Sequence, residues 1–449
     1  MDVNLPPVHE VSGFAAMRQL RESQVGFFAS THRPGRDIVR VKVGPPGLGV
    51  EIFLTHSPEA AELLLSAKSY AQFPKENRVY KQIRFLIGDG LLTSWGEDWR
   101  RQKALIQPIF TRARVDGYVD PILEELDDLK AELRAGARTV DLGETMMRFT
   151  LKIVCRVLFG ADLTAEQEDR VMLRFAVLNG AVIPRANIPM PFGLPLPMGP
   201  RVRTNQAELF ALCDDVIAQR RASSTTGDDL ASLLVAARDG DDQLSDDEVR
   251  EQILIFMLAG HETTSMSLTF ALHLLGRHPD VQQKVRDEVK QVLGDARPTA
   301  AQLISDLPYT MAVLKEAMRL YPAAPITGRR SLEDTTIGGY DVPAGSDVVL
   351  SVWSIHHRAD LWPDPERFDP GRFLGNPDIG RYQWMPFGAG PRACIGTHFS
   401  MLESVATIAE LVRDFDFVAP AGTSDQVPVG SGVTLFPLEP VNSQVTPRP

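Results

Sequence analysis

Residues 387–396 read Phe-Gly-Ala-Gly-Pro-Arg-Ala-Cys-Ile-Gly and contain Cys394, the last of three cysteines in the chain. The glycines and the proline predict a tight, irregular loop around the sulfur. Apolar residues at helical spacing follow over 399–412, so we expect Cys394 just before a helix N-terminus, where backbone N–H groups and the helix dipole favour a thiolate. Arg392 adds a positive charge two residues away. Such a cysteine can be a nucleophile, a metal ligand or one more small buried residue.

A polar segment interrupts an apolar helix earlier in the chain. Ser245 and Glu248 form a capping box that opens this helix, and we expect it to run to about Leu275 and to be buried. Its middle reads Ala-Gly-His-Glu-Thr-Thr at 259–264. A glycine, an acid and two threonines are unfavourable there, and such departures often mark a functional site. A hydroxyl that bonds back to a carbonyl can open a helix and hold water. A satisfied helix kink is the alternative; the zinc motif His-Glu-x-x-His fails because position 265 is Ser.

A charged pair with apolar neighbours lies between these two segments. Glu316 and Arg319 are three residues apart and therefore share one face of a predicted helix. A surface ion pair of this spacing is worth roughly 0.2–0.5 kcal/mol. If the pair is buried instead, it needs a third partner to offset desolvation.

These segments together resemble the cytochrome P-450 (haem-thiolate monooxygenase) family, soluble bacterial type. The cysteine loop is similar to its haem-binding signature Phe-x-x-Gly-x-Arg-x-Cys-x-Gly, residues 259–264 to its oxygen-binding motif, and 316–319 to its Glu-x-x-Arg motif. Trp99 and Lys103 match a Trp-x-x-x-Arg helix in which lysine replaces arginine, and residues 365–368 match Pro-Glu-Arg-Phe. The motifs follow the family's order along nearly the whole chain.

The resemblance implies the site residues. The cofactor would be haem b (iron protoporphyrin IX), with Cys394 as the metal ligand. Thr263 would position dioxygen and Glu262 would relay protons, whereas His261 would point elsewhere. The other cofactor-binding residues implied are Trp99, Lys103, Arg329 (with Arg330 as a near alternative), Phe387, Arg392 and Gly396. The substrate pocket implied contains Ile255, Leu258, Ala259, Pro325 and Ile326, and the structural lock consists of Glu316, Arg319 and Arg367.

The implied fold is mainly α with small β-sheets (α+β). It is a triangular helix-rich prism, with the haem between the long central helix and the helix after the cysteine loop, in one domain over residues 1–449. We expect strand-rich parts at about 37–55 and 325–350. The proline-rich segment Ile183–Pro200 cannot be a helix and is either a lid over the pocket or a packed connection. The polar tail, about 442–449, is expected to be disordered.

The implied activity is insertion of one oxygen atom of O2 into a hydrophobic small molecule such as a terpenoid, steroid or fatty acid. The chain contains no Gly-rich nucleotide fingerprint and no cysteine cluster for iron–sulfur, so electrons from NAD(P)H would arrive through a ferredoxin or flavodoxin and its reductase. Arg100, Arg101, Arg112 and Arg114 are either a docking patch for that acidic donor or ordinary solvated surface. The alternatives are a haem-thiolate peroxygenase or isomerase and a non-catalytic haem-binding sensor.

Composition narrows the class and the compartment. The net charge of −11 over 449 residues argues against nucleic acid as a partner. Three scattered cysteines fit a reducing cytoplasm. Since the sequence has neither an apolar run of about 20 residues nor a signal-peptide pattern at its start, we expect a cytoplasmic protein without a membrane span.

Overall fold

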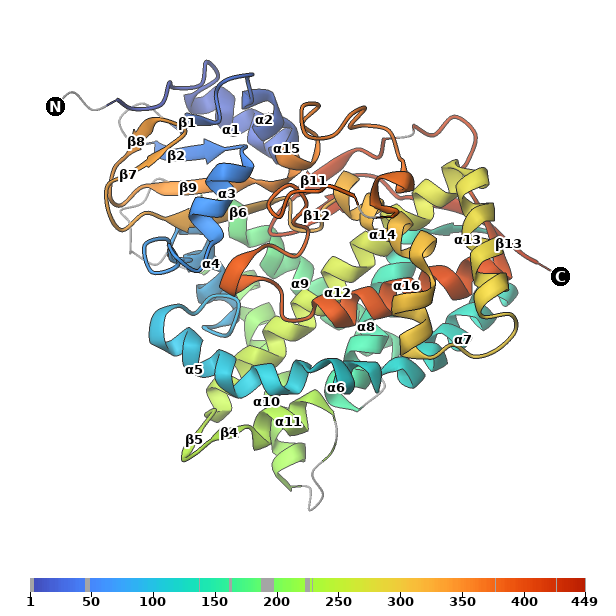
Figure 1. The fold of residues 1–449 in the computed structure, drawn as a ribbon. Coiled ribbons are helices and arrows are strands. Elements are labelled where there is room, and N and C mark those ends of the chain that lie inside the picture. The colour runs from blue at the N-terminus through green and yellow to red at the C-terminus, as the bar shows by residue number, and fades with distance from the viewer. Residues whose placement is uncertain are drawn as a thin grey trace.

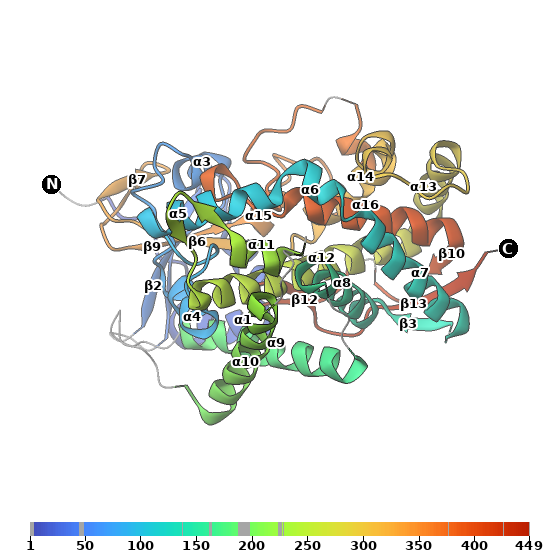
Figure 2. The same cartoon turned by 90° about the horizontal axis from the view of Figure 1, so that it is seen from below.

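The computed structural model describes residues 4–44, 49–136, 138–160, 164–186, 198–222, 227, 229–375, 377–424 and 426–448. The longest described helix, α12 (Asp246–Arg277), runs through the middle of the molecule (Figures 1 and 2). The predicted capping box begins it: Ser245 Oγ accepts from the Glu248 N–H at 3.2 Å, and Glu248 Oε2 accepts from the Ser245 N–H at 2.9 Å. As the all-round apolar sequence predicts, α12 is buried along most of its length.

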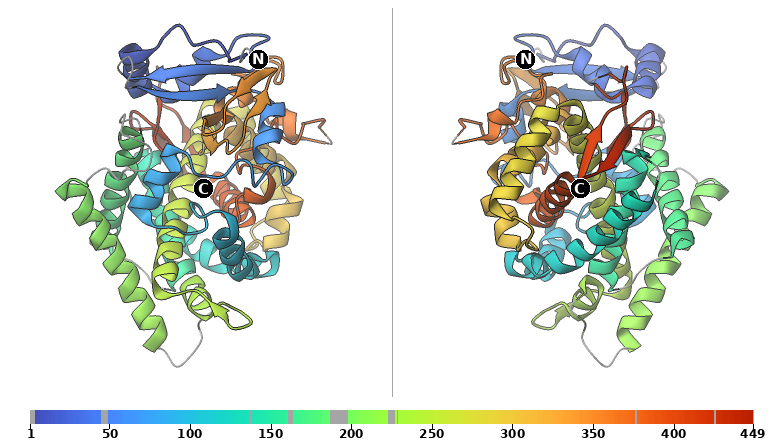
Figure 3. Two further views of the ribbon diagram at one scale, coloured as in Figure 1. Left: turned by 90° about the vertical axis from the view of Figure 1, so that its left-hand side faces the viewer. Right: turned by 90° about the vertical axis from the view of Figure 1, so that its right-hand side faces the viewer.

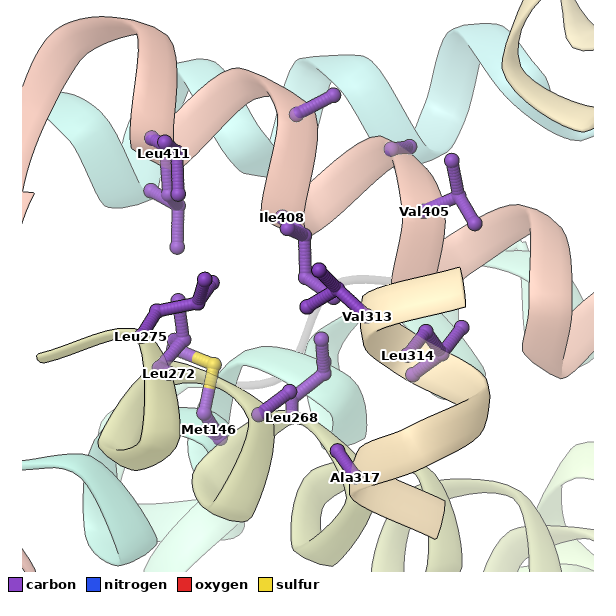
Figure 4. Close-up of a cluster of buried hydrophobic side chains, with 14 of the residues drawn as sticks. Met146, Leu268, Leu272, Leu275, Val313, Leu314, Ala317, Val405, Ile408 and Leu411 are labelled. Carbon is purple, nitrogen blue, oxygen red and sulfur yellow. The ribbon is translucent and has the colours of Figure 1, made fainter. Parts of the chain in front are cut away.

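Among the helices that pack against α12 are α8 (Leu142–Phe159), α14 (Pro308–Leu320) and α16 (Thr397–Asp414). Figure 4 shows side chains of all four helices gathered in one apolar cluster, among them Met146, Leu268, Val313 and Ile408. Burying each such side chain contributes roughly 1.5–3 kcal/mol. Helix α16 is thereby held beside α12, and the loop that precedes α16 is held with it.

A four-stranded sheet lies at the upper left in Figure 1, next to α1 and α2 and above α4 and α5; it is at the top in both views of Figure 3. Its order is β1-β2-β9-β6, with β1 (Ile38–Val43) antiparallel to β2 (Val50–Thr55), β2 parallel to β9 (Asp347–Ser351), and β9 antiparallel to β6 (Ile326–Arg330). The two strand-rich regions expected from the sequence therefore pair with each other. The predicted fold class, mainly α with small sheets, is confirmed.

The remaining elements complete the helical body and its small ribbons. The other α-helices are α1 (Gly13–Glu22), α2 (Gln24–Thr31), α3 (Pro58–Leu65), α4 (Arg78–Ile87), α5 (Gly96–Ile106), α6 (Arg112–Asp116), α7 (Val119–Ala135), α9 (Ala165–Ala186), α10 (Pro200–Ala222), α11 (Leu230–Ala236), α13 (Pro279–Val292) and α15 (Val352–His356). Short 3₁₀ or π turns are η1 (Gln107–Phe110), η2 (Gln302–Asp306), η3 (Pro370–Phe373) and η4 (Gly390–Arg392). The other strands are β3 (Thr139–Asp141), β4 (Arg238–Asp239), β5 (Asp242–Gln243), β7 (Thr335–Ile337), β8 (Tyr340–Val342), β10 (Phe415–Val418), β11 (Val429–Ser431), β12 (Leu435–Pro437) and β13 (Asn442–Pro447). Of the helices described, none has the length and apolarity that crossing a bilayer requires.

The C-terminal segment differs from the expected disorder. Strand β13 is the central strand of a three-stranded sheet, with β10 on one side and β3 on the other. Its side chains alternate, and Ser443 and Val445 are buried. Backbone pairing on both edges outweighs the polar, proline-containing composition on which the expectation rested.

The proline-rich segment Ile183–Pro200 is helical at both ends, contrary to the prediction. Residues 183–186 are the last turn of α9, with Pro184 inside it, and Pro200 begins α10. A proline in a last turn removes one hydrogen bond but does not have to support a continuing helix, whereas a proline at a first turn is favourable. The centre of the predicted lid, residues 187–197, lies outside the described residues.

Candidate active site

A cavity of about 340 Å³ lies between α12 and the cysteine loop. Cys394 and Thr263 both line it, so the structure brings together two motifs that are far apart in the sequence. Its walls are mostly apolar. The predicted site residues that line it are Trp99, Lys103, Ile255, Ala259, Thr263, Ile326, Arg329, Phe387, Arg392, Cys394 and Gly396.

Backbone contacts fix the cysteine loop. The Cys394 N–H donates to the Phe387 carbonyl at 2.9 Å, and the Thr397 hydroxyl donates to the Cys394 carbonyl at 2.9 Å. Gly390 has a φ of +70°, and a Cβ at this position would lie 1.7 Å from the Leu65 carbonyl oxygen. Conformation and space therefore both require glycine where the loop touches the end of α3.

Cys394 is exposed to the cavity that it lines, and the protein surrounds it on its other sides. Desolvation by these surroundings raises the pKa of its thiol; the Gly396 backbone N–H, the Thr397 side chain and the Lys75 ammonium lower it by less. The backbone donor of the loop thus favours the thiolate, as the sequence predicts, but removal from water outweighs it and the net shift of the pKa is upward. A coordinated metal cation would reverse the order, since coordination deprotonates a thiol outright.

The polar segment of α12 presents Thr263 to the cavity. Thr263 Oγ1 donates to the Ala259 carbonyl at 2.6 Å, which is the back-bonding expected from the sequence. The α-helix continues unbroken through this turn, so the expected local opening is not observed. A carbonyl has two lone pairs and can accept the hydroxyl in addition to the helical N–H. Gly260 lets α12 approach α8, since a Cβ there would lie 2.9 Å from Val154 Cγ2.

Glu262, adjacent to Thr263, does not line the cavity. Its Oε1 accepts from Asn179 Nδ2 of α9 at 2.5 Å. Burial raises the pKa of its carboxyl to about 7, although hydrogen bonds from Thr434 and Asn179 lower it. The two predicted catalytic side chains thus lie on different faces of α12, as neighbours on an α-helix must. His261 also points elsewhere, as expected: its Nδ1 lies 2.6 Å from the Met257 carbonyl, and burial lowers its pKa to about 4.

Besides Lys103, three cationic side chains line the same cavity: Lys75, Arg329 and Arg392. Burial lowers all three pKa values, that of Lys75 to about 7 and that of Arg392 to about 10, and repulsion from the nearby arginines adds to both. Each donates to a backbone carbonyl, at 3.3, 2.8 and 2.8 Å respectively. Within the described part of the chain, none of the three forms an ion pair with a carboxylate. The cavity therefore has an excess of buried positive charge, which favours an anionic ligand.

Lys75 and its neighbour Tyr80 were not predicted. The Lys75 ammonium lies 4.8 Å from the centre of the Tyr80 ring, and Tyr80 lines the cavity too. Both come from the irregular stretch before α4 or from α4 itself. In the sequence, Lys75 stands two residues after the apolar Phe73, and this pattern is too common to indicate a site. The structure shows that Phe73 is buried.

The predicted pair on α5 lies beside the cysteine loop. Arg392 and Lys103 both lie against the Trp99 ring, with charged atoms 4.6 and 4.9 Å from its centre. Lys103 Nζ also donates to the Pro391 carbonyl at 3.0 Å. A cation over an indole face contributes roughly 0.5–2 kcal/mol, so Trp99 stabilises the charges that border the cavity.

Two predicted pocket residues do not line the cavity. Leu258 packs into the apolar core instead, because the cavity face of α12 repeats every four residues through Ile255, Ala259 and Thr263. Pro325 is also absent from the wall; its carbonyl accepts from the Trp353 N–H at 2.9 Å. Its neighbours Ala323, Ala324, Ile326 and Thr327 line the cavity.

The predicted lock exists, but one member was assigned wrongly. Glu316 and Arg319 form a fully buried ion pair. The second arginine beside Glu316 is Arg372, whose Nε lies 3.3 Å from Oε1. Arg367 contributes only its backbone carbonyl, 3.3 Å from Arg319 Nη2. The chain contains Pro-x-Arg-Phe twice, at 365–368 and 370–373, and the turn η3 directs the second arginine to Glu316.

Comparison with known proteins identifies the family. The profile of the family described as Cytochrome P450 matches residues 4–446. The chain is 35% identical over 401 residues to cyclooctat-9-en-7-ol 5-monooxygenase of Streptomyces melanosporofaciens, covering 86% of this chain and 84% of that protein. It is 31% identical to pentalenene oxygenase of Streptomyces avermitilis, covering 88% and 87%, and 31% identical to cyclooctatin synthase of Streptomyces melanosporofaciens, covering 92% and 89%. The chain belongs to the cytochrome P450 family and is a cytochrome P450 monooxygenase.

The family implies a haem-iron cofactor, and the cavity fits one. Haem carries two propionates and an iron that takes a thiolate ligand. The cavity offers one cysteine sulfur together with three cations that lack carboxylate partners among the described residues. Among those residues no cluster of three His, Cys, Asp or Glu side chains could hold a bare metal ion.

Proposed function

We propose that Cys394 is the thiolate ligand of a haem b held in this cavity, and that the enzyme oxygenates a terpenoid-like substrate. One observation carries the proposal: Cys394, Thr263 and three cations that have no carboxylate partner among the described residues line one largely apolar cavity. Lys75, Arg329 and Arg392 would bind the propionates, with Trp99 behind Arg392. Lys103 also lines the cavity and donates to the loop backbone, and it would support the loop.

The haem supplies dioxygen activation when bound, and the thiolate favours O–O cleavage. The residues of this chain then have separate roles. The apolar walls bind and orient the substrate and exclude water, Thr263 presents its hydroxyl group to the cavity, and Glu262 supplies a proton from behind. A peroxygenase or isomerase would need no such acid beside Thr263, so the pair favours monooxygenation.

The substrate class rests on the cavity wall and on the relatives. Apolar side chains dominate the wall, among them Leu92, Ile255, Phe256 and Ile326, and polar anchors are few, which suits a compact hydrocarbon or its alcohol. The names of the relatives, cyclooctat-9-en-7-ol 5-monooxygenase and pentalenene oxygenase, refer to such compounds. We therefore place terpenoids ahead of steroids and fatty acids. A binding screen that follows the shift of the haem Soret band, with members of all three classes, tests this order of preference. If a fatty acid bound most tightly, the preference for terpenoids would be contradicted.

Electrons derived from NAD(P)H would come from a ferredoxin or flavodoxin and its reductase. Arg112 and Arg114 of α6 are exposed and, among the described residues, form no ion pairs. Arg101 pairs with Asp242 and Glu248, and Arg100 pairs with Glu97. The docking charge is therefore assigned to Arg112 and Arg114. Charge reversal at both should slow reduction of the haem without changing substrate binding. Charge reversal at Arg21 of the distant α1 should leave both the reduction rate and substrate binding unchanged. Equal slowing of reduction by the two sets of variants would contradict the assignment.

The carbon monoxide spectrum of the reduced, haem-loaded protein tests the thiolate. We expect a strongly red-shifted Soret band in the natural protein and in Cys155→Ser, because Cys155 is buried away from the cavity. Cys394→Ser should lose the band while still binding haem. Persistence of the band in Cys394→Ser would refute the assignment. Turnover with substrate and a donor system then distinguishes an enzyme from a haem-binding sensor.

A further inference from the structure

A second polar site lies behind the cavity, where α9, α12 and the turn between β11 and β12 meet. Asn179 Nδ2 lies 2.5 Å from Glu262 Oε1 and 3.3 Å from Thr434 Oγ1. The Val433 N–H donates to Asn179 Oδ1 at 3.2 Å. Since this N–H requires an acceptor, the orientation of the Asn179 amide is fixed and its NH2 group must face Glu262.

The site is joined to the cavity wall through the backbone. The Leu435 N–H donates to the Ala323 carbonyl at 2.9 Å, and Ala323 lines the cavity. Thr434, directly before Leu435, is buried. The turn therefore holds Thr434 and Val433 at a fixed distance from the cavity, while Asn179 belongs to a different element, α9.

Glu262 is the titratable group at this junction. Its Oε2 is buried and accepts no hydrogen bond from the described residues. The groups that face it, Asn179 from α9 and Thr434 from the turn, are uncharged, and burial with these two hydrogen bonds accounts for a pKa of about 7. The adjacent His261 is neutral, because burial lowers its pKa to about 4. Near neutral pH the carboxyl can therefore either hold or release its proton.

Glu262 is nevertheless turned away from the group that it would serve. Successive residues of an α-helix point about 100° apart, and only Thr263 of the two lines the cavity. The carboxyl must change its rotamer to approach Thr263, and the hydrogen bond from Asn179 opposes that change. The helix α9 thus controls whether the acid can reach the hydroxyl.

We propose that Asn179 and Thr434 are positioning residues for proton delivery, which hold the Glu262 carboxyl behind α12 until release from Asn179 lets it reach Thr263. The inference rests on the proposed function. Glu262 Oε2 then gives its proton to Thr263 Oγ1, Thr263 releases its own hydroxyl proton into the cavity, and solvent returns a proton to the Glu262 carboxylate.

The first test needs no turnover. The carbonyl stretch of the protonated Glu262 is followed by infrared spectroscopy in the ferric, haem-loaded protein during a pH titration, and its absence in Glu262→Gln makes the assignment. The midpoint should lie near 7 in the natural protein. Asn179→Leu removes a donor to the carboxylate and should raise the midpoint by about one unit. Thr434→Val should raise it by less, and Asn205→Leu on α10, whose amide donates to the Arg201 carbonyl of the same helix, should leave it unchanged.

The second test follows catalysis. The fraction of reducing equivalents recovered as product should fall several-fold in Asn179→Leu, with KM unchanged, and its pH profile should move with the infrared midpoint. Unchanged midpoints in both Asn179→Leu and Thr434→Val would overturn the proposal, as would an equal shift in Asn205→Leu. Failure of the proposed function would appear elsewhere, in the carbon monoxide spectrum, because the infrared titration does not depend on the ligand of the iron.

Discussion

The Arg319 guanidinium and the Glu316 carboxylate form a two-point ion pair, with Nε 2.7 Å from Oε2 and Nη2 2.9 Å from Oε1. Both side chains are fully buried. Arg319 Nη1 also donates to the His356 carbonyl at 2.7 Å, and His356 Nε2 accepts from the Met385 N–H at 3.0 Å. Since Met385 lies two residues before Phe387, the pair on α14 is connected to the start of the cysteine loop.

The first prediction distinguishes the contributions of Arg367 and Arg372, the arginines of the two Pro-x-Arg-Phe segments, to the stability of the lock. Arg372→Gln should lower the free energy of unfolding by roughly 1–3 kcal/mol, because it removes a cation beside a buried carboxylate. Arg367→Gln should be close to neutral, since only its backbone carbonyl contacts the lock. Arg319→Ala should lower the free energy of unfolding by roughly 3–5 kcal/mol and should lose much of the bound haem. Denaturant unfolding measures all three; equal losses for Arg367 and Arg372 would contradict the assignment of Arg372.

A second prediction concerns two glycines of the cysteine loop. Gly388 and Gly390 have nearly equal positive φ angles of +68° and +70°. A Cβ at Gly388 would meet nothing within 4 Å, whereas one at Gly390 would meet the Leu65 backbone. Gly388→Ala should therefore lower the free energy of unfolding only by the roughly 1–2 kcal/mol that alanine costs in the left-handed backbone conformation. Gly390→Ala should lower the free energy of unfolding by clearly more, and it should also lower the haem content. Unfolding curves and haem-to-protein ratios measure the difference, and similar values for the two variants would refute the close contact.

The third prediction is a pH dependence of stability at Glu262. Its folded pKa is raised from 4.5 to about 7, so the folded state retains a proton that the unfolded state loses between these values. Stability must then fall as pH rises from about 4.5 to 7 and stay lower above that range. The side chain in Glu262→Gln does not titrate. Across this pH window the free energy of unfolding of this variant should therefore rise relative to that of the natural protein, by up to roughly 3 kcal/mol. A difference in unfolding free energy that is constant with pH would show that the Glu262 pKa is not raised.

Local patterns predicted the elements and the motif order because each signal lies within a few residues. The capping box at Ser245, the strands around the turn after Val43 and the loop at Cys394 are of this kind. What the sequence could not show depends on distant partners. Strand β13 exists because β3 and β10 flank it, and the choice between Arg367 and Arg372 depends on how η3 turns.

The candidate site follows the same division. Cys394 and Thr263 belong to motifs with several fixed positions, and both line the cavity. Lys75 has no motif around it and becomes notable only through its burial beside Arg329 and Arg392. The charge state of Cys394 could not be predicted either, because desolvation is a property of the assembled cavity.

The last prediction uses Lys75 to test whether the cations await an anionic ligand. In the haem-free protein its ammonium is buried and, among the described residues, has no carboxylate partner, so its pKa falls to about 7. Lys75→Met should then stabilise the haem-free protein by a few kcal/mol near neutral pH. The same variant should release haem faster, because one propionate partner is lost. Lys68→Met, at an exposed position, should change neither property. Thermal unfolding of the haem-free protein and haem transfer to an acceptor measure the two effects. Opposite signs are expected only if Lys75 faces a bound anion; a loss of stability in both forms would mean that Lys75 serves the fold and not the ligand.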